Sequence, residues 1–155
     1  MKPLALATKI PPPALFVLFF GGMWLMDQHT VSVELYPNAR LSVASVLLTI
    51  GLYFSYSSIY LFIKAKTTIN PTRPQNSVVL VTDGLYRYSR NPMYLALFID
   101  LLAWGVFLAN IYSLIFAILF VPLMNILQII PEEKAMELNF REHYTTYKTK
   151  VNRWL

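Results

Sequence analysis

Two groups of polar residues stand beside long apolar stretches of this 155-residue chain, and their types could do chemistry. Arg90, Asn91 and Tyr94 lie where one apolar stretch begins, and Glu132 and Glu133 lie where another ends. An arginine, an amide, a phenol and two carboxylates, if brought together, could bind a zwitterion that bears ammonium and carboxylate groups. The simpler alternatives are membrane anchoring for the first group and a solvated helix start for the second.

A third group lies inside the last apolar stretch. Asn125, Gln128 and Glu132 are spaced i, i+3, i+7, which places them on one face of a helix. Polar residues within a membrane helix are functional by default, although Asn and Gln also hold helices together. We expect Asn125 and Gln128 to contact a substrate. Asp100 belongs to the same class and is expected to need an interior partner.

The elements that must position these residues are transmembrane helices. Hydrophobic residues make up 56% of the chain and charged residues 14%, and a soluble domain of this size could not bury so much apolar surface. Four apolar runs reach the length that crosses a bilayer as a helix, and only helices or closed barrels satisfy the backbone there. The runs are 10–26, 41–63, 93–109 and 111–130.

The net charge of +5 reflects membrane topology and does not indicate nucleic-acid binding. If the amino terminus is cytoplasmic, Arg40 is the one basic residue of thirteen that falls outside, as the positive-inside rule requires. The amino terminus, the segment 64–90 and the carboxyl terminus are therefore predicted to face the cytoplasm. The chain has no cysteine and only two isolated histidines, so no metal site is expected.

The cytoplasmic ends of the third and fourth helices should bring the polar groups together. Asn110 marks a tight turn between these helices and makes them an antiparallel pair. After Pro131, apolar residues spaced by three or four predict an amphipathic cytoplasmic helix over Glu132–Leu155. This helix could lie on the membrane surface, or it could form a lid beneath the bundle. The carboxylate of Glu132 falls on its apolar face, which favours the lid.

The predicted fold class is therefore an all-α polytopic membrane protein with four transmembrane helices and a carboxy-terminal amphipathic helix. Residues 1–155 form a single integral membrane domain, with two amino-terminal helices in 1–63 and the functional core in 64–155. No segment between the helices is long enough to fold alone. The sequence leaves open whether the first helix packs within the chain or against a second copy in a homodimer.

The stretch from about Thr67 to Leu155 resembles the isoprenylcysteine carboxyl methyltransferase family, which is similar to phospholipid N-methyltransferases. An Arg-Asn-Pro-x-Tyr motif followed by a later Glu-Glu pair is more specific than either part alone. The matching pieces are Thr67–Pro71, Leu80–Arg87, Ser89–Tyr94, Asn125, Gln128–Glu133, Phe140, Tyr144, Tyr147 and Val151–Leu155.

The resemblance implies an integral membrane methyltransferase that uses S-adenosylmethionine and acts on a lipophilic or membrane-embedded small molecule. It implies a cofactor enclosed between the third and fourth helices, the segment before them and the carboxy-terminal helix. By motif position, the cofactor-binding residues would be Val78, Val79, Leu80, Val81, Tyr86, Asn91, Pro92, Met93, Tyr94 and Glu132. The polar groups described above add Arg90 and Glu133, and Glu132 and Arg90 are the candidates for catalysis.

Two positions depart from the family pattern. Gln128 stands where the eukaryotic prenylcysteine enzymes have an arginine for the substrate carboxylate, so a different acceptor is expected. Phe140-Arg141 stands where a Phe-Gly pair is common, so Arg141 replaces a conformationally permissive glycine. Two other functions stay open: a membrane reductase of the sterol-reductase type that uses NADPH, and a non-enzymatic scaffold whose basic face binds anionic lipid.

Overall fold

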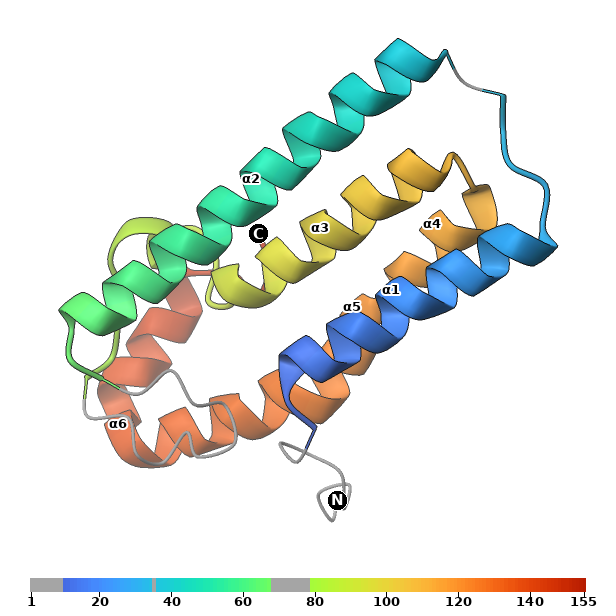
Figure 1. Ribbon diagram of the computed structural model, residues 1–155. Helices are drawn as coiled ribbons and strands as arrows, with labels where there is room; N and C mark the ends of the chain where they lie inside the picture. The colour runs from blue at the N-terminus through green and yellow to red at the C-terminus, as the bar shows by residue number, and fades with distance from the viewer. Residues whose placement is uncertain (1–9, 35, 68–78) are drawn as a thin grey trace.

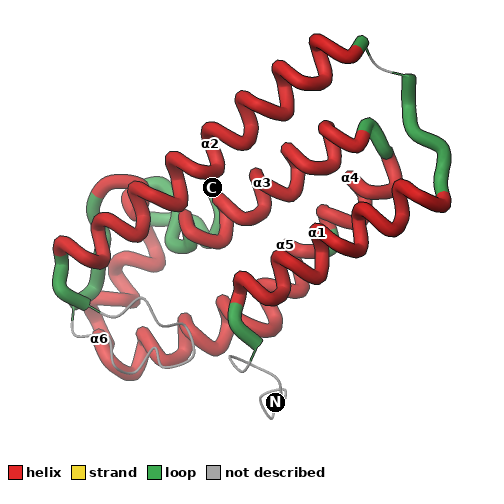
Figure 2. Tube along the Cα trace, viewed as in Figure 1, coloured by secondary structure: helices red, strands yellow, loops and turns green. Residues whose placement is uncertain are grey.

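The computed structural model describes residues 10–34, 36–67 and 79–155, and these residues form helices without strands. The long helices run side by side, and a bent helical region closes one end (Figures 1 and 2). The all-α class is confirmed for this part of the chain. The elements are α1 (Pro12–His29), α2 (Pro37–Lys64), η2 (Gly84–Arg87), α3 (Pro92–Leu108), α4 (Ile111–Ile118), α5 (Phe120–Met124), the π-helical η3 (Asn125–Ile129) and α6 (Ile130–Lys150).

Proline residues mark the starts of the long helices. Pro12, Pro37 and Pro92 each occupy the first turn of α1, α2 and α3. Their missing amide hydrogens leave no helical bond unmade there, and their fixed φ angle suits the first turn of a helix. These three boundaries therefore follow from local sequence.

The turn between α3 and α4 is as tight as the sequence predicts. Ala109 ends α3 in the left-handed conformation, with φ 53°. The Asn110 side chain then caps α4 by accepting hydrogen bonds from the amides of Tyr112 and Ser113 at 3.0 and 3.1 Å. A capping asparagine satisfies two of the amides that a helix start leaves free. The two helices consequently run antiparallel.

α3 is the central helix, with α2 on one side and α1 and α4 on the other (Figure 1). The side of α2 that faces α3 carries small residues, and Ala44, Gly51 and Ser58 are its buried positions. A Cβ atom at Gly51 would lie 2.0 Å from Oδ1 of Asp100, so only glycine allows this approach. Oδ1 of Asp100 is buried without a hydrogen-bond partner among the described residues. The structure therefore shows no interior hydrogen-bond partner for this one oxygen among the described residues.

α1 packs within its own chain. Phe19 stacks on Phe116 with ring centroids 4.7 Å apart and meets Phe120 edge-on at 5.3 Å. The Ser113 hydroxyl donates to the carbonyl of Met23 at 2.8 Å. These contacts attach α1 to the α4–α5 segment, so one surface of the first helix is already covered.

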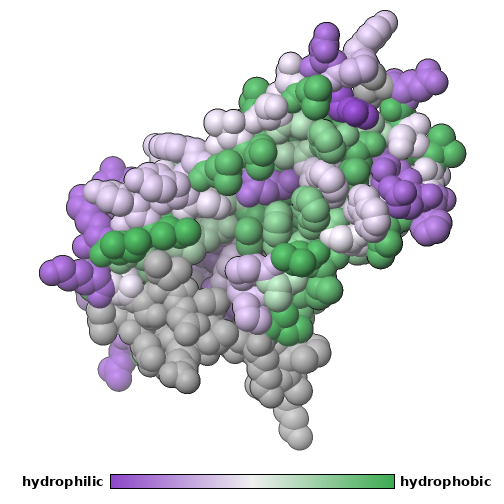
Figure 3. All heavy atoms as spheres, viewed as in Figure 1, coloured by the Kyte–Doolittle hydropathy of each residue, from purple (hydrophilic) through white to green (hydrophobic). Residues whose placement is uncertain are grey.

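In the described part of the chain, two helices are long and apolar enough to cross a membrane by length and composition. One is α2, and the other is the helix that runs through α4, α5, η3 and α6 over Ile111–Lys150. α3 is apolar but has 17 residues. Apolar residues cover much of the middle of the molecule in the face shown, while the most hydrophilic residues gather towards its ends (Figure 3). The four-span topology stays a prediction.

The carboxy-terminal helix differs from its predicted form. It begins at Ile130 as a direct continuation of η3, and it is broken at Arg141, where φ is 44° and ψ is −119°. Lys148 Nζ lies 2.7 Å from Glu137 Oε1 across this break, whereas a straight helix would separate the two residues by roughly 16 Å. The chain therefore turns back at Arg141, and a single amphipathic face over Glu132–Leu155 is not formed.

Candidate active site

Glu133 is the centre of a buried ionic cluster. Its Oε1 accepts hydrogen bonds from Arg90 Nη2 at 2.7 Å and Arg153 Nε at 3.0 Å, and its Oε2 accepts one from Arg153 Nη2 at 2.7 Å. The Glu133 and Arg90 side chains are each 8% exposed. The Glu133 cluster, by which we mean Arg90, Glu133 and Arg153, thus joins the start of α3, α6 and the carboxy-terminal tail.

The Glu133 carboxylate is held in its ionised form. Burial raises its pKa, but the hydrogen bonds and charges of Arg153 and Arg90 outweigh burial and lower the pKa below its usual value. Glu133 follows the apolar run 111–130 and lies outside the predicted membrane span. Two cations surround one anion, so the cluster carries a net charge of one positive unit.

Arg90 also fastens the end of α6. Its Nη1 donates to the carbonyls of Lys148 and Val151 at 3.0 and 2.9 Å, and its backbone amide donates to the carbonyl of Asn152 at 2.9 Å. A cation at a helix carboxyl end satisfies carbonyls that lack helical partners. Nε of Arg90 is buried and has no hydrogen-bond partner in the described part of the chain.

Glu132 has a different environment from its neighbour. It accepts a hydrogen bond from the Tyr94 hydroxyl of α3 and has no described ion pair. Burial raises the pKa of Glu132 to about 7, the Tyr94 hydrogen bond opposes this rise, and the charge of Glu133 adds to it. Two adjacent carboxylates therefore differ in protonation near neutral pH, a separation typical of functional sites.

The carboxy-terminal tail is tied to the rest of the site by side-chain hydrogen bonds. Nδ2 of Asn91 donates to the carbonyl of Arg153 at 3.0 Å. The Tyr147 hydroxyl donates to the carbonyl of Tyr86 at 2.6 Å, which connects α6 to η2. These bonds place the tail beneath the start of α3, in the position that a lid would occupy.

The structure brings together the five polar residues that the sequence singled out at the two helix ends. Arg90, Asn91, Tyr94, Glu132 and Glu133 share one network of contacts. Of the other predicted cofactor-binding residues, Tyr86 is buried and bonded to α6 through the Tyr147 hydroxyl. Pro92 is buried, Met93, Leu80 and Val81 are partly buried, Val79 is exposed, and Val78 lies outside the described residues.

The two residues predicted to contact substrate have partners within the protein. Gln128 is fully buried, and its Nε2 donates to the carbonyl of Ile10 at the start of α1. Oδ1 of Asn125 accepts a hydrogen bond from Trp154 Nε1 at 3.1 Å. Both amides therefore join separate segments of the chain, which is the ordinary role of such residues between membrane helices.

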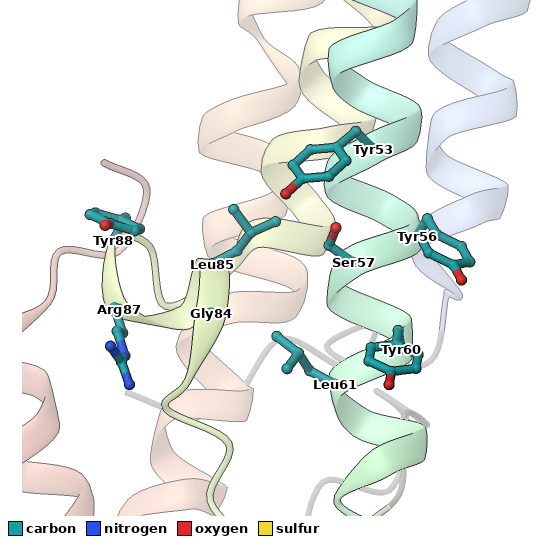
Figure 4. Close-up of a pocket in the computed structure, with 9 residues that line it drawn as sticks. All are labelled: Tyr53, Tyr56, Ser57, Tyr60, Leu61, Gly84, Leu85, Arg87 and Tyr88. Atoms are coloured by element: carbon teal, nitrogen blue, oxygen red, sulfur yellow. The ribbon is translucent and has the colours of Figure 1, made fainter.

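Sequence reasoning missed Arg153 and a pocket beside α2. Arg153 belongs to the closing Val-Asn-Arg-Trp-Leu motif, and the resemblance of that motif to the family is the signal that could have found it. The pocket lies between α2 and η2, where Tyr53, Tyr60 and Arg87 are among the lining residues (Figure 4). The segments meet only in the folded chain, so no spacing rule indicates that pocket.

The family model described as "Phospholipid methyltransferase" matches residues 39–143. The chain belongs to the phospholipid methyltransferase family. The match runs from α2 into α6 and contains Arg90, Tyr94, Glu132 and Glu133, whereas Arg153 follows it. The family and the two apolar helices together support a membrane methyltransferase.

A protein of Haemophilus influenzae, described as "Uncharacterized protein", is 43% identical to this chain over 63 residues, which are 41% of this chain and 100% of that protein. No solved structure matches the chain. The family model thus confirms the family to which the sequence motifs pointed.

Proposed function

We propose that this member of the phospholipid methyltransferase family transfers a methyl group from S-adenosylmethionine to a lipophilic acceptor. The observation that carries the proposal is the contrast between two adjacent carboxylates. Glu133 is saturated by Arg90 and Arg153, whereas Glu132 accepts a single described hydrogen bond, from Tyr94. An incompletely paired carboxylate beside a fixed cluster can bind a cationic ligand.

The side chains present fit this cofactor. Glu132 supplies a carboxylate for its ammonium or sulfonium group, and Nε of Arg90 is a buried donor without a described partner that suits its carboxylate. Val79, Leu80 and Val81, in the segment before η2, offer apolar contacts for the remainder of the ligand. Because its other nitrogens bond protein groups, Arg90 serves first as a positioning residue.

When bound, the cofactor supplies an electrophilic methyl group for in-line transfer. The residues contribute orientation and the exclusion of water. The tail held by Arg90 and Asn91 covers the cytoplasmic end of α3. With a pKa of about 7, Glu132 can also accept a proton from a neutral amine, thiol or hydroxyl acceptor.

The acceptor in this proposal is not a prenylcysteine carboxylate. Gln128 stands where an arginine would bind that carboxylate, and its amide bonds the start of α1. We propose further that the chain forms one integral membrane domain with four spans and cytoplasmic termini. Gln128 fixes the start of α1 and Asn125 fixes the tail, and through these contacts the two residues shape the acceptor site.

Direct ligand binding tests the proposal. The full chain, purified in detergent, should bind S-adenosylhomocysteine in a calorimetric titration and should not bind NADPH. Labelled methyl groups should then move from the cofactor into the lipid extract of a membrane fraction. Binding of NADPH alone would assign the protein to the reductases. Binding of neither ligand would exclude both the methyltransferase and the reductase function and would favour a non-enzymatic scaffold.

A further inference from the structure

Asp100 is the only acidic or basic residue in the four apolar runs of the chain, which are 10–26, 41–63, 93–109 and 111–130. It is also the middle residue of α3. The predicted third span therefore carries a carboxyl group near the centre of the bilayer. A charged group at that depth is costly without a partner, and such residues mark sites for ligands or ions.

The described residues give this carboxyl group no counter-ion. Oδ1 of Asp100 is buried without a hydrogen-bond partner among them, and none of their ion pairs includes Asp100. A second copy of the chain could not supply a cation at this depth, because none of the four apolar runs contains a lysine, an arginine or a histidine. The partner must therefore come from another molecule.

Gly51 of α2 makes room for the carboxyl group. A Cβ atom at Gly51 would lie 2.0 Å from Oδ1 and 2.7 Å from Cγ of Asp100, so the carboxyl group occupies the space that a larger residue would fill. Asp100 is nevertheless only partly buried. The group thus lies at the edge of the contact between α2 and α3, where a ligand can reach it.

The next turn of α3 contacts α1. Trp104 Nε1 donates to the carbonyl of Phe20 at 3.2 Å, and the two rings stack with centroids 4.2 Å apart. Phe107 stacks on Trp104 at 5.3 Å. Residues four apart share one face of a helix, so Asp100 and Trp104 lie on the side of α3 between α1 and α2. A hydrophilic patch interrupts the apolar surface between these helices (Figure 3).

We propose that Asp100 anchors a binding site for a lipophilic amine that enters from the bilayer between α1 and α2. The ammonium group of the ligand is the counter-ion that the carboxylate lacks. The apolar body of the ligand packs on the aromatic rings of Phe20, Trp104 and Phe107. The amine of a phospholipid head group does not fit this site, because head groups lie roughly 15 Å from the bilayer centre.

This site is separate from the candidate active site. Tyr94, which bonds Glu132, precedes Asp100 by six residues, a separation of about 9 Å along the axis and about 120° around the helix. Asp100 approaches α2, whereas Tyr94 bonds α6. The inference concerns binding alone and does not depend on methyl transfer.

The test compares two probes that share one hydrocarbon cage, 1-aminoadamantane and the uncharged 1-adamantanol. Equilibrium dialysis of each labelled probe against the full chain in detergent, at neutral pH, measures their affinities. We expect the amine to bind about tenfold or more tightly than the alcohol, and Asp100→Asn to abolish this difference. Asp83→Asn is the matched control, because it makes the same change at a side chain that is 75% exposed. Equal affinities for the two probes in the wild type, or an undiminished preference in Asp100→Asn, would overturn the site.

Thermal unfolding separates ligand binding from a structural role of Asp100. Asp100→Asn should melt no lower than the wild type, because it removes a charge from apolar surroundings, and loss of binding without loss of stability cannot result from misfolding. A lower melting temperature would show that the carboxyl group holds α2 against α3. Displacement of the probe by phosphatidylethanolamine would show that the site takes a lipid head group, and dissociation of a dimer by the probe would show that a second copy covers it. Each of these three results would overturn the proposal.

Discussion

Arg90 and Glu133 are 43 residues apart in the chain, and their side chains meet at 2.7 Å in a site where each is 8% exposed. The contact joins the start of α3 to α6. Arg153 binds the opposite oxygen of the same carboxylate at 2.7 Å. The position of the carboxy-terminal tail therefore depends on one buried anion that bridges two cations.

Glu133→Gln should destabilise the protein strongly. The substitution leaves two guanidinium groups without their counter-ion, and breaking a buried ion pair costs about 3–5 kcal/mol. Thermal unfolding in detergent measures the effect. Glu137→Gln is the control, because the Glu137–Lys148 pair is 42% and 38% exposed and should contribute less than about 1 kcal/mol. Equal melting temperatures for the two variants would contradict the assigned role of Glu133.

Glu132→Gln should weaken binding of S-adenosylhomocysteine while leaving the fold intact. The glutamine can still accept the Tyr94 hydrogen bond, but it offers no charge to an ammonium group. The loss of a charged hydrogen-bond partner is expected to cost about 1.5–3 kcal/mol of binding free energy. Calorimetry measures the affinity of this variant and of the control Glu137→Gln, which removes a charge from the surface outside the site. Wild-type affinity in both variants would exclude Glu132 from the cofactor site.

The affinity for S-adenosylhomocysteine should rise with pH and level off above neutrality. Glu132 has a pKa of about 7, raised chiefly by burial. Below that value its carboxyl group is protonated and cannot pair with a cation, so affinity should fall by up to about tenfold per pH unit. Titrations between pH 5.5 and pH 8.5 measure the profile. A profile that persists unchanged in Glu132→Gln would assign the titration to another group.

Arg141→Gly should stabilise the protein. Arg141 has φ 44° and ψ −119°, a conformation that side chains strain and glycine adopts freely. Relief of that strain is worth about 1–3 kcal/mol, partly offset by the greater entropy of glycine in the unfolded chain. Arg141→Ala keeps the Cβ atom and should give no gain. A rise in melting temperature for alanine equal to that for glycine would show that loss of charge, and not backbone strain, is responsible.

Reporter fusions after Thr67 and after Leu155 should both read cytoplasmic. The reason is the distribution of Lys and Arg, of which Arg40 alone lies in the predicted external loops. A fusion after Glu34, in the first of those loops, should read external and serves as the control. Opposite sides for the Thr67 and Leu155 fusions would exclude four spans.

The sequence by itself determined the features that arise from local chemistry. Proline at the first turn set the starts of α1 and α3, and Asn110 predicted the tight turn before α4. α2 begins at Pro37, before the apolar run that predicted it. Apolar composition indicated a membrane protein, because lipid must cover surface that a small fold cannot bury. The Glu-Glu pair and the Arg-Asn-Pro-x-Tyr motif indicated the candidate site, since their residue types are costly in apolar surroundings without partners.

Only the tertiary structure decided which partner each polar residue has. Glu133, and not Glu132, became the saturated carboxylate because the chain turns back at Arg141 and brings Arg153 alongside it. Gln128 bonds the start of α1 because α1 packs against the fourth helical segment. These pairings join segments far apart in the chain, and a helical period fixes the face on which a side chain lies but not the segment that will cover it.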